Sequence, residues 1–377
     1  MNFFINANRE PYRYFFPLGA IYLIWGALIW LPQIWNAGDY PVLAHRYLML
    51  NGFAASFIVG FLMTAVPKFS QTFTARKFEI IFFFLITVLG LFFAYNESDK
   101  NVSLISALQA LTILFFLFSR IFKRKVNPPY SFVFIFVGLI LWLVSGVSGI
   151  FFESDILKRL HYEGAIAAII LGVGSRLVPG ILGHVEIVMA QRERYEKPVA
   201  LLRTVPFDFL LYIFSFVGSY FVSNEEWGSG LRALIVMVIA MKYWLLWKLP
   251  KLRSALTWCI WSAAWLIVLS FTLRAAWPEG IIHIGHSFFI NGIVLMSLLI
   301  GVRVTQSHGP NDKSYEESKI LYLITLLVFS AAATRVCAFL MPELYLTHLG
   351  YSAFLLVLAV LCWIVKYGRL CFVLPKK

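Results

Sequence analysis

Residues 43–67, LAHRYLMLNGFAASFIVGFLMTAVP, decide the fold of this chain. An α-helix needs roughly 20 mostly apolar residues to cross the hydrocarbon core of a bilayer, and this stretch supplies them. It carries one histidine, His45, near its start, and it ends at Pro67. The stretch therefore predicts a membrane-spanning helix, over about 43–66, with an ionisable side chain near one end.

The composition of the whole chain leads to the same conclusion. Of its 377 residues, 60% are apolar, 17% are aromatic and only 14% are charged. A soluble domain carries about 25% charged residues, so these few charges cannot cover a water-facing surface of this size. Intrinsic disorder, a collagen-like repeat and a disulfide scaffold are excluded as well. The sequence therefore predicts an integral membrane protein with many spans.

Eleven further stretches resemble the first in length and apolarity, with short polar connections between them. The twelve predicted spans are about 15–35, 43–66, 78–95, 102–122, 130–151, 157–181, 204–222, 229–248, 255–277, 280–305, 319–340 and 345–368. The predicted fold is all-α: a polytopic protein with twelve transmembrane helices in a single transmembrane domain over residues 1–377. The first span has no obvious cleavage site, so no signal peptide is expected.

The basic residues set the predicted orientation. The N-terminus, the loops after even-numbered spans and the C-terminus hold 24 Lys and Arg residues, against 7 near the opposite side. This excess predicts that both termini are cytoplasmic. The net charge of +13 is thus spread over many loops, which argues against nucleic acid as a partner.

Common catalytic and cofactor motifs are absent from the sequence. There is no C-x-x-C-H for covalent haem, no P-loop and no H-E-x-x-H zinc motif. The four cysteines form no close pair in the sequence and are expected to be buried thiols; they are Cys259, Cys337, Cys362 and Cys371.

The seven histidines are unevenly placed. Five lie near the outer starts of predicted spans 2, 6, 10 and 12, namely His45, His161, His283, His286 and His348. His184 and His308 mark the inner ends of spans 6 and 10. Spans 2, 6 and 10 are four apart, so the pattern predicts three pseudo-repeats of four helices.

Several histidines in one membrane layer favour a metal site. Neutral imidazole binds haem iron, copper and non-haem iron, and facing helices can each contribute one ligand. The arginines at comparable depth, Arg46, Arg274 and Arg335, are candidates to bind haem propionates. The alternatives are interfacial hydrogen-bonding histidines and, for His184 and His308, histidines favoured by the dipole at a helix C-terminus. Glu163 either carries protons or pairs with Lys158 or Arg159.

Three motifs resemble those of the NnrS family. Ala44-His45, Gly52-Phe53-Ala54-Ala55 and the run from Gly60 to Pro67 resemble its second helix. The series His286, Arg303 and His308-Gly309 resembles its tenth helix, and His161, Arg176 and Gly183-His184 resemble the matching sixth. The family has twelve spans, so the resemblance extends over the whole chain. This chain departs from the family's His-x-His-Glu in helix 2, where it reads His45-Arg46-Tyr47-Leu48.

The resemblance implies a protein of the bacterial inner membrane that contains haem and copper and acts in nitric-oxide metabolism or resistance. The expected helix organisation is also similar to the main subunit of haem-copper oxidases and nitric-oxide reductases, which is a fold-level analogy. On this basis the expected cofactor is a non-covalent b-type haem, with copper as a second candidate.

The site assignments follow from these two sources. His45 and His286 are the predicted haem ligands, with Arg46, Arg274 and Arg335 as propionate partners and Arg176 and Arg303 as further cofactor-binding candidates. Candidate ligands of a second metal are His161, His283 and His348, together with His184 and His308. Glu163 is the candidate catalytic carboxyl group, as a proton carrier.

The expected function is that of a haem-binding oxidoreductase or sensor acting on nitric oxide. It would use an unidentified electron donor and have membrane lipids as neighbours. Two alternatives stay open. One is a secondary transporter, although a repeat of four helices rather than six argues against it. The other is a non-catalytic haem or metal subunit of a respiratory complex.

Overall fold

The structure is a computed structural model that describes residues 9–34, 40–195, 200–309 and 312–373. Every regular element in these ranges is helical. Ten helical stretches there are long and apolar enough to cross a membrane: Tyr12–Gln33, Val42–Ser70, Lys77–Tyr95, Asp99–Ile121, Phe132–Phe151, Asp155–Ile181, Ala255–Ala276, Pro278–His308, Lys313–Leu340 and Pro342–Cys371. The predicted all-α class is confirmed for the described residues, and the ten stretches support a multi-pass membrane protein.

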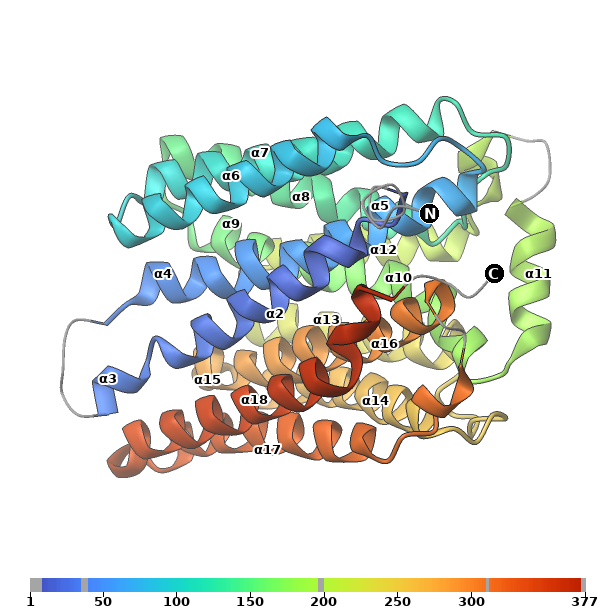
Figure 1. Cartoon of the computed structure of the whole chain (residues 1–377). Coiled ribbons are helices and arrows are strands. Elements are labelled where there is room, and N and C mark those ends of the chain that lie inside the picture. Colours follow the sequence, from blue (N-terminus) through green and yellow to red (C-terminus); the bar gives the residue numbers. More distant parts are fainter. Residues whose placement is uncertain (1–8, 35–39, 196–199, 310–311, 374–377) are drawn as a thin grey trace.

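The helices lie alongside one another in one bundle (Figure 1). The elements that form the ten stretches are α2 (Tyr12–Leu28) and α3 (Leu31–Ile34); α4 (Val42–Arg46), η1 (Tyr47–Ala54) and α5 (Ala55–Ser70); α6 (Lys77–Tyr95); α7 (Asp99–Ile121); α8 (Phe132–Phe151); α9 (Asp155–Arg159), η2 (Leu160–Ala165) and α10 (Ile166–Ile181); α14 (Ala255–Ala276); η5 (Pro278–Gly280), α15 (Ile281–Ser287), η6 (Phe288–Leu295) and α16 (Met296–His308); η7 (Lys313–Tyr315) and α17 (Ile320–Leu340); and η8 (Pro342–Leu344), α18 (Tyr345–Tyr367) and η9 (Gly368–Cys371).

The two ends of the bundle differ. At one end the first and last described helices meet, since Arg13 Nη1 donates to the Cys371 carbonyl at 3.0 Å; we name it the terminal end. The opposite end, where α4, α9 and α15 begin, is named the histidine end (Figure 1).

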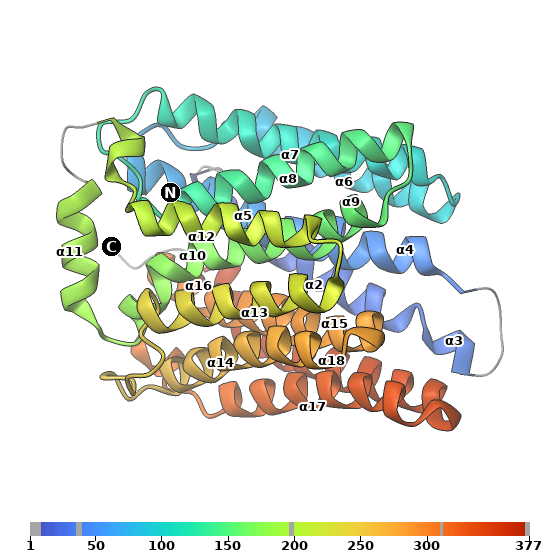
Figure 2. The ribbon, with the colours of Figure 1, turned by 180° about the vertical axis from the view of Figure 1, so that it is seen from behind.

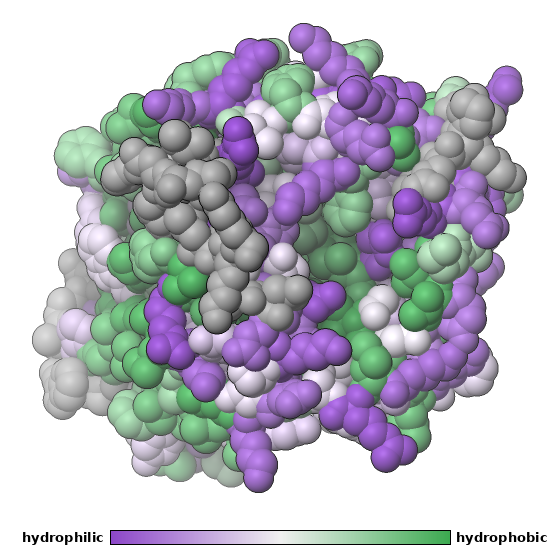
Figure 3. Space-filling model, turned by 45° about the vertical axis from the view of Figure 1, so that its right-hand side comes forward, coloured by the Kyte–Doolittle hydropathy of each residue, from purple (hydrophilic) through white to green (hydrophobic). Residues whose placement is uncertain are grey.

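The flank of the bundle is apolar and its terminal end is polar. On α6, for example, Ile81, Phe84, Leu85 and Phe92 are exposed, as is expected of side chains that face lipid. Figure 3, which turns the terminal end towards the viewer, shows hydrophilic side chains gathered there and hydrophobic ones along the flank.

Three long helical stretches form the centre of the bundle. They are Val42–Ser70, Asp155–Ile181 and Pro278–His308, and 78, 72 and 83% of their most apolar windows are buried, against at most 56% in the other seven. These are predicted spans 2, 6 and 10. Burial on all sides requires them to be apolar all round, which their sequences are.

Each central stretch also contains a π-helical segment near the histidine end. The segments are η1, η2 and η6, and each includes a polar residue followed by glycine: Asn51-Gly52, Glu163-Gly164 and Asn291-Gly292. A π-helical turn holds more residues than an α-helical one and is often found at functional sites. The three segments therefore mark the histidine end as the region to search for a site.

Predicted spans 7 and 8 are shorter or more polar helices than expected. They correspond to α12 (Phe207–Gly218), extended by η4 (Ser219–Phe221), and to α13 (Glu225–Lys242). Figure 2 shows both running alongside α8, α10 and α14. The segment Phe207–Phe221 is apolar but short, and α13 carries Glu225, Glu226, Arg232 and Lys242.

One predicted boundary is wrong. Helix α13 ends at Lys242 rather than near residue 248, because the chain turns through Leu245 (φ 57°) and buries Trp244, whose Nε1 donates to Ser175 Oγ at 3.2 Å. The connection between predicted spans 6 and 7 contains a helix, α11 (Val185–Tyr195), which lies across the terminal end (Figure 1). Residue 35, the predicted end of the first span, lies outside the described residues.

Candidate cofactor site at the histidine end

Four of the predicted site residues line one cavity at the histidine end, which we name the histidine cavity. They are His45, Arg46, His286 and Arg335, and the cavity volume is about 480 Å³. Most of the remaining lining is apolar: Ala27, Met49, Leu50, Phe53, Phe289, Ile290, Ile293, Val294, Leu349, Ala353 and Leu356. An apolar cavity of about 300–1,000 Å³ with a few polar groups is typical of cofactor sites.

Both histidines of this cavity have a defined tautomer. His45 Nδ1 lies 2.8 Å from the Gly26 carbonyl oxygen on α2, and His286 Nδ1 lies 2.6 Å from the carbonyl oxygen of Ile282. A carbonyl oxygen only accepts hydrogen bonds, so Nδ1 carries the proton in each neutral ring. Nε2 therefore keeps its lone pair. A hydrogen bond from the other ring nitrogen is what commonly orients a metal-binding histidine.

The two histidines occupy equivalent places on their helices. His45 lies two residues before η1 and His286 lies two residues before η6. The central helices thus bring the two imidazoles to one cavity from different segments of the chain. This is how helical bundles usually assemble a cofactor site.

Arg335 joins the histidine cavity to a third histidine. Its Nη1 lies 2.5 Å from His283 Nδ1, which must accept the hydrogen bond because guanidinium only donates. The His283 ring also stacks on Phe339, with centroids 5.8 Å apart. His283 therefore positions Arg335, and its Nδ1 lone pair is already used.

Arg46 and Tyr162 separate the histidine cavity from a smaller one. Both residues line both cavities, and the Arg46 guanidinium carbon lies 5.1 Å from the centre of the Tyr162 ring. The smaller cavity has a volume of about 40 Å³ and is lined by Asp99, Ser145, Glu153 and His161 among others; we name it the vestibule. Arg46 is paired with Asp99, and buried Ser145 Oγ has no hydrogen-bond partner among the described residues.

His161 belongs to a buried hydrogen-bond network rather than to the histidine cavity. Ser106 Oγ accepts from Trp142 Nε1 at 2.7 Å and from Asn51 Nδ2 at 3.0 Å, which uses both of its lone pairs. Its own proton must therefore go to His161 Nε2, 2.9 Å away. Because Nε2 accepts this bond, it has no lone pair left for a metal.

Glu163 lies in a buried ionic cluster. Its carboxylate accepts from Tyr220 Oη at 2.9 Å and from Arg274 Nη1 at 3.0 Å, and Arg232 Nε lies 3.6 Å away. Glu225 completes the cluster by pairing with Arg232 at 2.6 Å and with Arg159. None of these residues lines the histidine cavity. The described ion pairs of Glu163 are thus with Arg274 and Arg232, not with Lys158 or Arg159.

The remaining predicted residues lie away from the histidine cavity. At the terminal end, His308 Nδ1 lies 2.9 Å from Glu10 Oε1, and Arg303 pairs with Glu316 at 2.5 Å. Buried His184 follows α10, and the Arg176 guanidinium carbon lies 5.7 Å from the centre of the Phe69 ring. His348 is at the histidine end, but neither of its ring nitrogens has a partner among the described residues.

Within the described ranges, no three or more His, Cys, Asp or Glu side chains gather to hold a metal ion. The five outer histidines therefore do not form one multi-histidine centre. The histidine cavity is instead lined by two histidines whose Nε2 keeps its lone pair, by two arginines and by apolar side chains. That donor set fits haem, whose iron takes axial imidazoles and whose carboxylates pair with arginine.

Some residues of the site were not found from the sequence. Tyr162 and Tyr345 line the histidine cavity, and Tyr220, Glu225 and Arg232 surround Glu163. A signal was present for Arg232, because a charge inside an apolar helix marks a buried partner or a functional group. Nothing in the sequence pointed to Tyr162 beyond its place next to His161.

The comparisons with known proteins agree with the motifs. The family model described as NnrS protein matches residues 7–372, nearly the whole chain. No curated protein matches the chain.

Proposed function

Since the chain belongs to the NnrS family, we propose that it is a haem-binding membrane protein of nitric-oxide metabolism. Family membership suggests a role related to nitric oxide, and the geometry suggests where a cofactor would sit. In our proposal His45 and His286 would hold a b-type haem in the histidine cavity through Nε2, and Arg46 and Arg335 would bind its propionates.

One observation carries this proposal: two histidines 241 residues apart in the sequence line the same apolar cavity with Nδ1 engaged by a backbone carbonyl. Three other histidines are less suited. His161 Nε2 is used by Ser106, His283 Nδ1 by Arg335, and His308 Nδ1 faces Glu10. We retain copper as a second candidate metal, with these same two imidazoles as its ligands.

When bound through both imidazoles, haem would supply an iron that carries electrons, and nitric oxide would bind that iron only by displacing one of the two imidazoles. The residues of the chain have three tasks. The apolar lining from Phe53, Ile290 and Ile293 excludes water, the His283 hydrogen bond orients Arg335, and the Gly26 carbonyl orients His45. Reduction of nitric oxide also consumes protons and electrons, so an oxidoreductase activity would need a donor. The vestibule, next to Arg46 and Tyr162, is a better entry for protons than Glu163, which is held by two arginines.

The proposal includes an arrangement in the membrane. We propose that α12–η4 and α13 also cross it, which gives twelve spans in three units of four helices, each with one central stretch. The terminal end would face the cytoplasm and the histidine end the opposite side of a bacterial inner membrane. The three π-helical segments and the basic residues at the terminal end support this arrangement.

The test is an absorption spectrum with iron and copper analysis of the purified chain, before and after titration with nitric oxide. We expect a Soret band that shifts on addition of nitric oxide, and loss or alteration of that band in His286→Ala. His348→Ala is the matched control, because His348 lies at the same end but outside the cavity lining. Absence of both a Soret band and bound metal would falsify the proposal, and substrate uptake by such metal-free protein would favour a transporter.

A further inference from the structure

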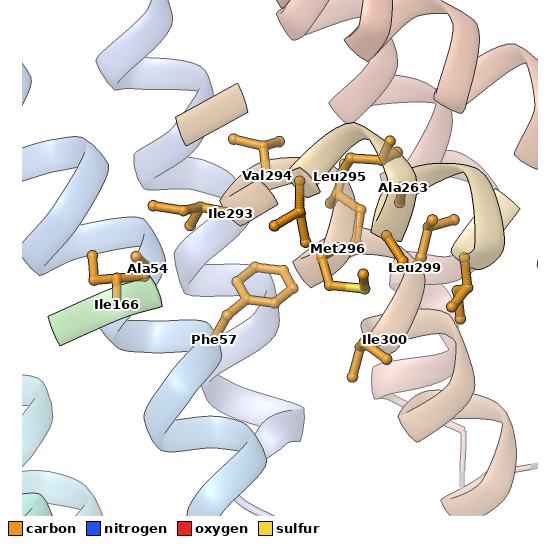
Figure 4. Packing of buried hydrophobic residues seen from close by; sticks show 14 of the residues in the cluster. Ala54, Phe57, Ile166, Ala263, Ile293, Val294, Leu295, Met296, Leu299 and Ile300 are labelled. Carbon is orange, nitrogen blue, oxygen red and sulfur yellow. The ribbon is translucent and has the colours of Figure 1, made fainter. Parts of the chain in front are cut away.

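A second cavity lies deeper in the bundle, on the terminal-end side of the histidine cavity. Its volume is about 70 Å³, and its lining comes from α2, α5, α10 and α16; we name it the central void. Figure 4 shows Phe57 of α5 projecting towards Met296 and Ile300 of α16, which are three of the lining residues. The void thus lies where the three central helices meet.

The central void and the histidine cavity are separated by one layer of side chains. Phe53 lines the histidine cavity and Phe57, one helical turn further on, lines the void; their ring centroids are 5.1 Å apart. On the facing helix, Ile293 lines the histidine cavity and Met296 lines the void. One α-helical turn rises about 5.4 Å, so a small molecule in the void would be next to the histidine cavity.

The lining of the void is unsuited to water. It consists of apolar side chains and glycines, and Ser297 is the only polar residue among those that line it. A buried water needs two to four hydrogen-bonding partners, and apolar cavities stay dry and bind xenon or benzene instead. The void therefore suits a small, uncharged, weakly polar molecule.

The packing around the void is otherwise tight. A Cβ added at Gly174 would lie 2.5 Å from the Trp244 ring, and one at Gly301 would lie 3.2 Å from Trp363. Both glycines line the void, so large side chains pack closely behind its walls. Protein interiors are generally packed as densely as organic crystals. Because the side chains behind the walls of this void are themselves closely packed, loose packing does not explain it.

We propose that the central void is a binding site for a small apolar gas. Nitric oxide is an uncharged diatomic that dissolves in hydrocarbon, so this site would hold it one side-chain layer from the histidine cavity. That the physiological gas is nitric oxide depends on the proposed function, whereas the capacity to bind an apolar gas does not.

Xenon is the probe that tests the site, because it requires no haem and no turnover. We expect purified protein in nanodiscs to show saturable xenon binding, read from the NMR shift of the Met296 methyl group, which lines the void and not the larger histidine cavity. Val173→Phe, which fills the void, is expected to weaken that binding about tenfold, which corresponds to about 1.4 kcal/mol. Leu85→Phe makes the same kind of enlargement on the exposed face of α6 and should leave it unchanged. Ile300→Ala enlarges the void and should preserve or strengthen binding.

The outcomes separate the two proposals. Absence of saturable xenon binding in the wild-type chain, or equal binding by Val173→Phe and Leu85→Phe, would overturn the gas site whatever the haem content. If the protein binds xenon in this way but has no haem, the result would support the gas site and contradict the proposed function. If Val173→Phe does not fold, as judged by its circular dichroism, Ser297→Leu fills the void from the opposite helix and is read by the same criteria.

Discussion

Substitution of Glu163 by Gln is expected to destabilise the protein strongly, through the ionic cluster at the histidine end. The cluster contains two carboxylates, Glu163 and Glu225, and three guanidinium groups, Arg159, Arg232 and Arg274. Its net charge is therefore +1. The Gln variant keeps the shape of the side chain but leaves one carboxylate against three guanidinium groups, a net charge of +2 inside the bundle.

The magnitude follows from burial. The side chains of Glu163, Arg232 and Arg274 are 8, 0 and 6% exposed, so solvent screens them little. Removal of one member of a buried ion pair costs about 3–5 kcal/mol, because its partners stay buried without compensation. Arg274→Gln is the informative comparison. It leaves two carboxylates against two guanidinium groups, so it should cost less than Glu163→Gln even though both remove the same 3.0 Å contact.

The assay is the apparent melting temperature of the purified variants in one detergent at one heating rate, since membrane proteins often unfold irreversibly. We expect Glu163→Gln to melt several degrees below Arg274→Gln, at about 2–4 °C per kcal/mol as in mid-sized domains. Equal melting temperatures of wild type and Glu163→Gln would refute the structural role. If Glu163→Gln then lost activity but not stability, the result would support Glu163 as a proton carrier.

Three further predictions concern packing, hydrogen bonding and pH. Ser106→Ala leaves Trp142, Asn51 and His161 without a shared partner and should cost about 1–3 kcal/mol per unsatisfied group, seen as a lower melting temperature. Thr112→Ala should change it little, because Thr112 is half-buried on the same helix and its hydroxyl donates to the Leu108 carbonyl of that helix. Gly138→Ala places a Cβ 2.6 Å from the Ala165 carbonyl oxygen and should cost about 1–3 kcal/mol by forcing α8 away from η2, whereas Gly230→Ala, with open space around it, should be tolerated. For Glu10, burial raises the pKa, but the hydrogen bonds and charges of His308 and Arg13 outweigh it and leave the pKa below 4.5. The stabilisation by Glu10 is then present above the unfolded-state pKa and lost as the pH falls through the folded-state value, so Glu10→Gln should melt below wild type at neutral pH and alike in strong acid.

The sequence was sufficient to predict the all-α class of the described residues, and it singled out His45 and His286, which line the same cavity. His45 and His286 are equivalent because each precedes a π-helical segment by two residues, and that equivalence was visible as the spacing of spans 2 and 10. Motifs that resemble the NnrS family lie in these same two stretches.

The hydrogen-bond partners of the other outer histidines could not be predicted in the same way. Depth along a helix can be read from the sequence, but the neighbour that a side chain faces depends on how helices far apart in the chain pack. His161 meets Ser106 of α7, and His283 meets Arg335 of α17, 52 residues later in the chain. The π-helical segments add a further difficulty, because they change the angle between successive side chains from the α-helical value that sequence patterns assume.

The shorter helices α12 and α13 illustrate a different limit. Their mixture of apolar and charged residues was interpreted as two spans, and the structure places Glu225 and Arg232 of α13 in the ionic cluster with Glu163. The charges are compensated within the bundle rather than exposed to water. Hydropathy along one sequence cannot distinguish a charge that is paired inside a bundle from one that ends a span.

The measurement that tests the central claim most directly is the haem-to-protein ratio of four forms: wild type, His45→Ala, His286→Ala and the double variant, with His348→Ala as the control. If both imidazoles hold one haem, the wild-type chain binds one haem, each single variant loses it or shows an altered spectrum, and the double variant binds none. The control should keep the wild-type ratio and spectrum. A double variant that retains the wild-type haem content and absorption spectrum would contradict the assignment of the histidine cavity as the haem site.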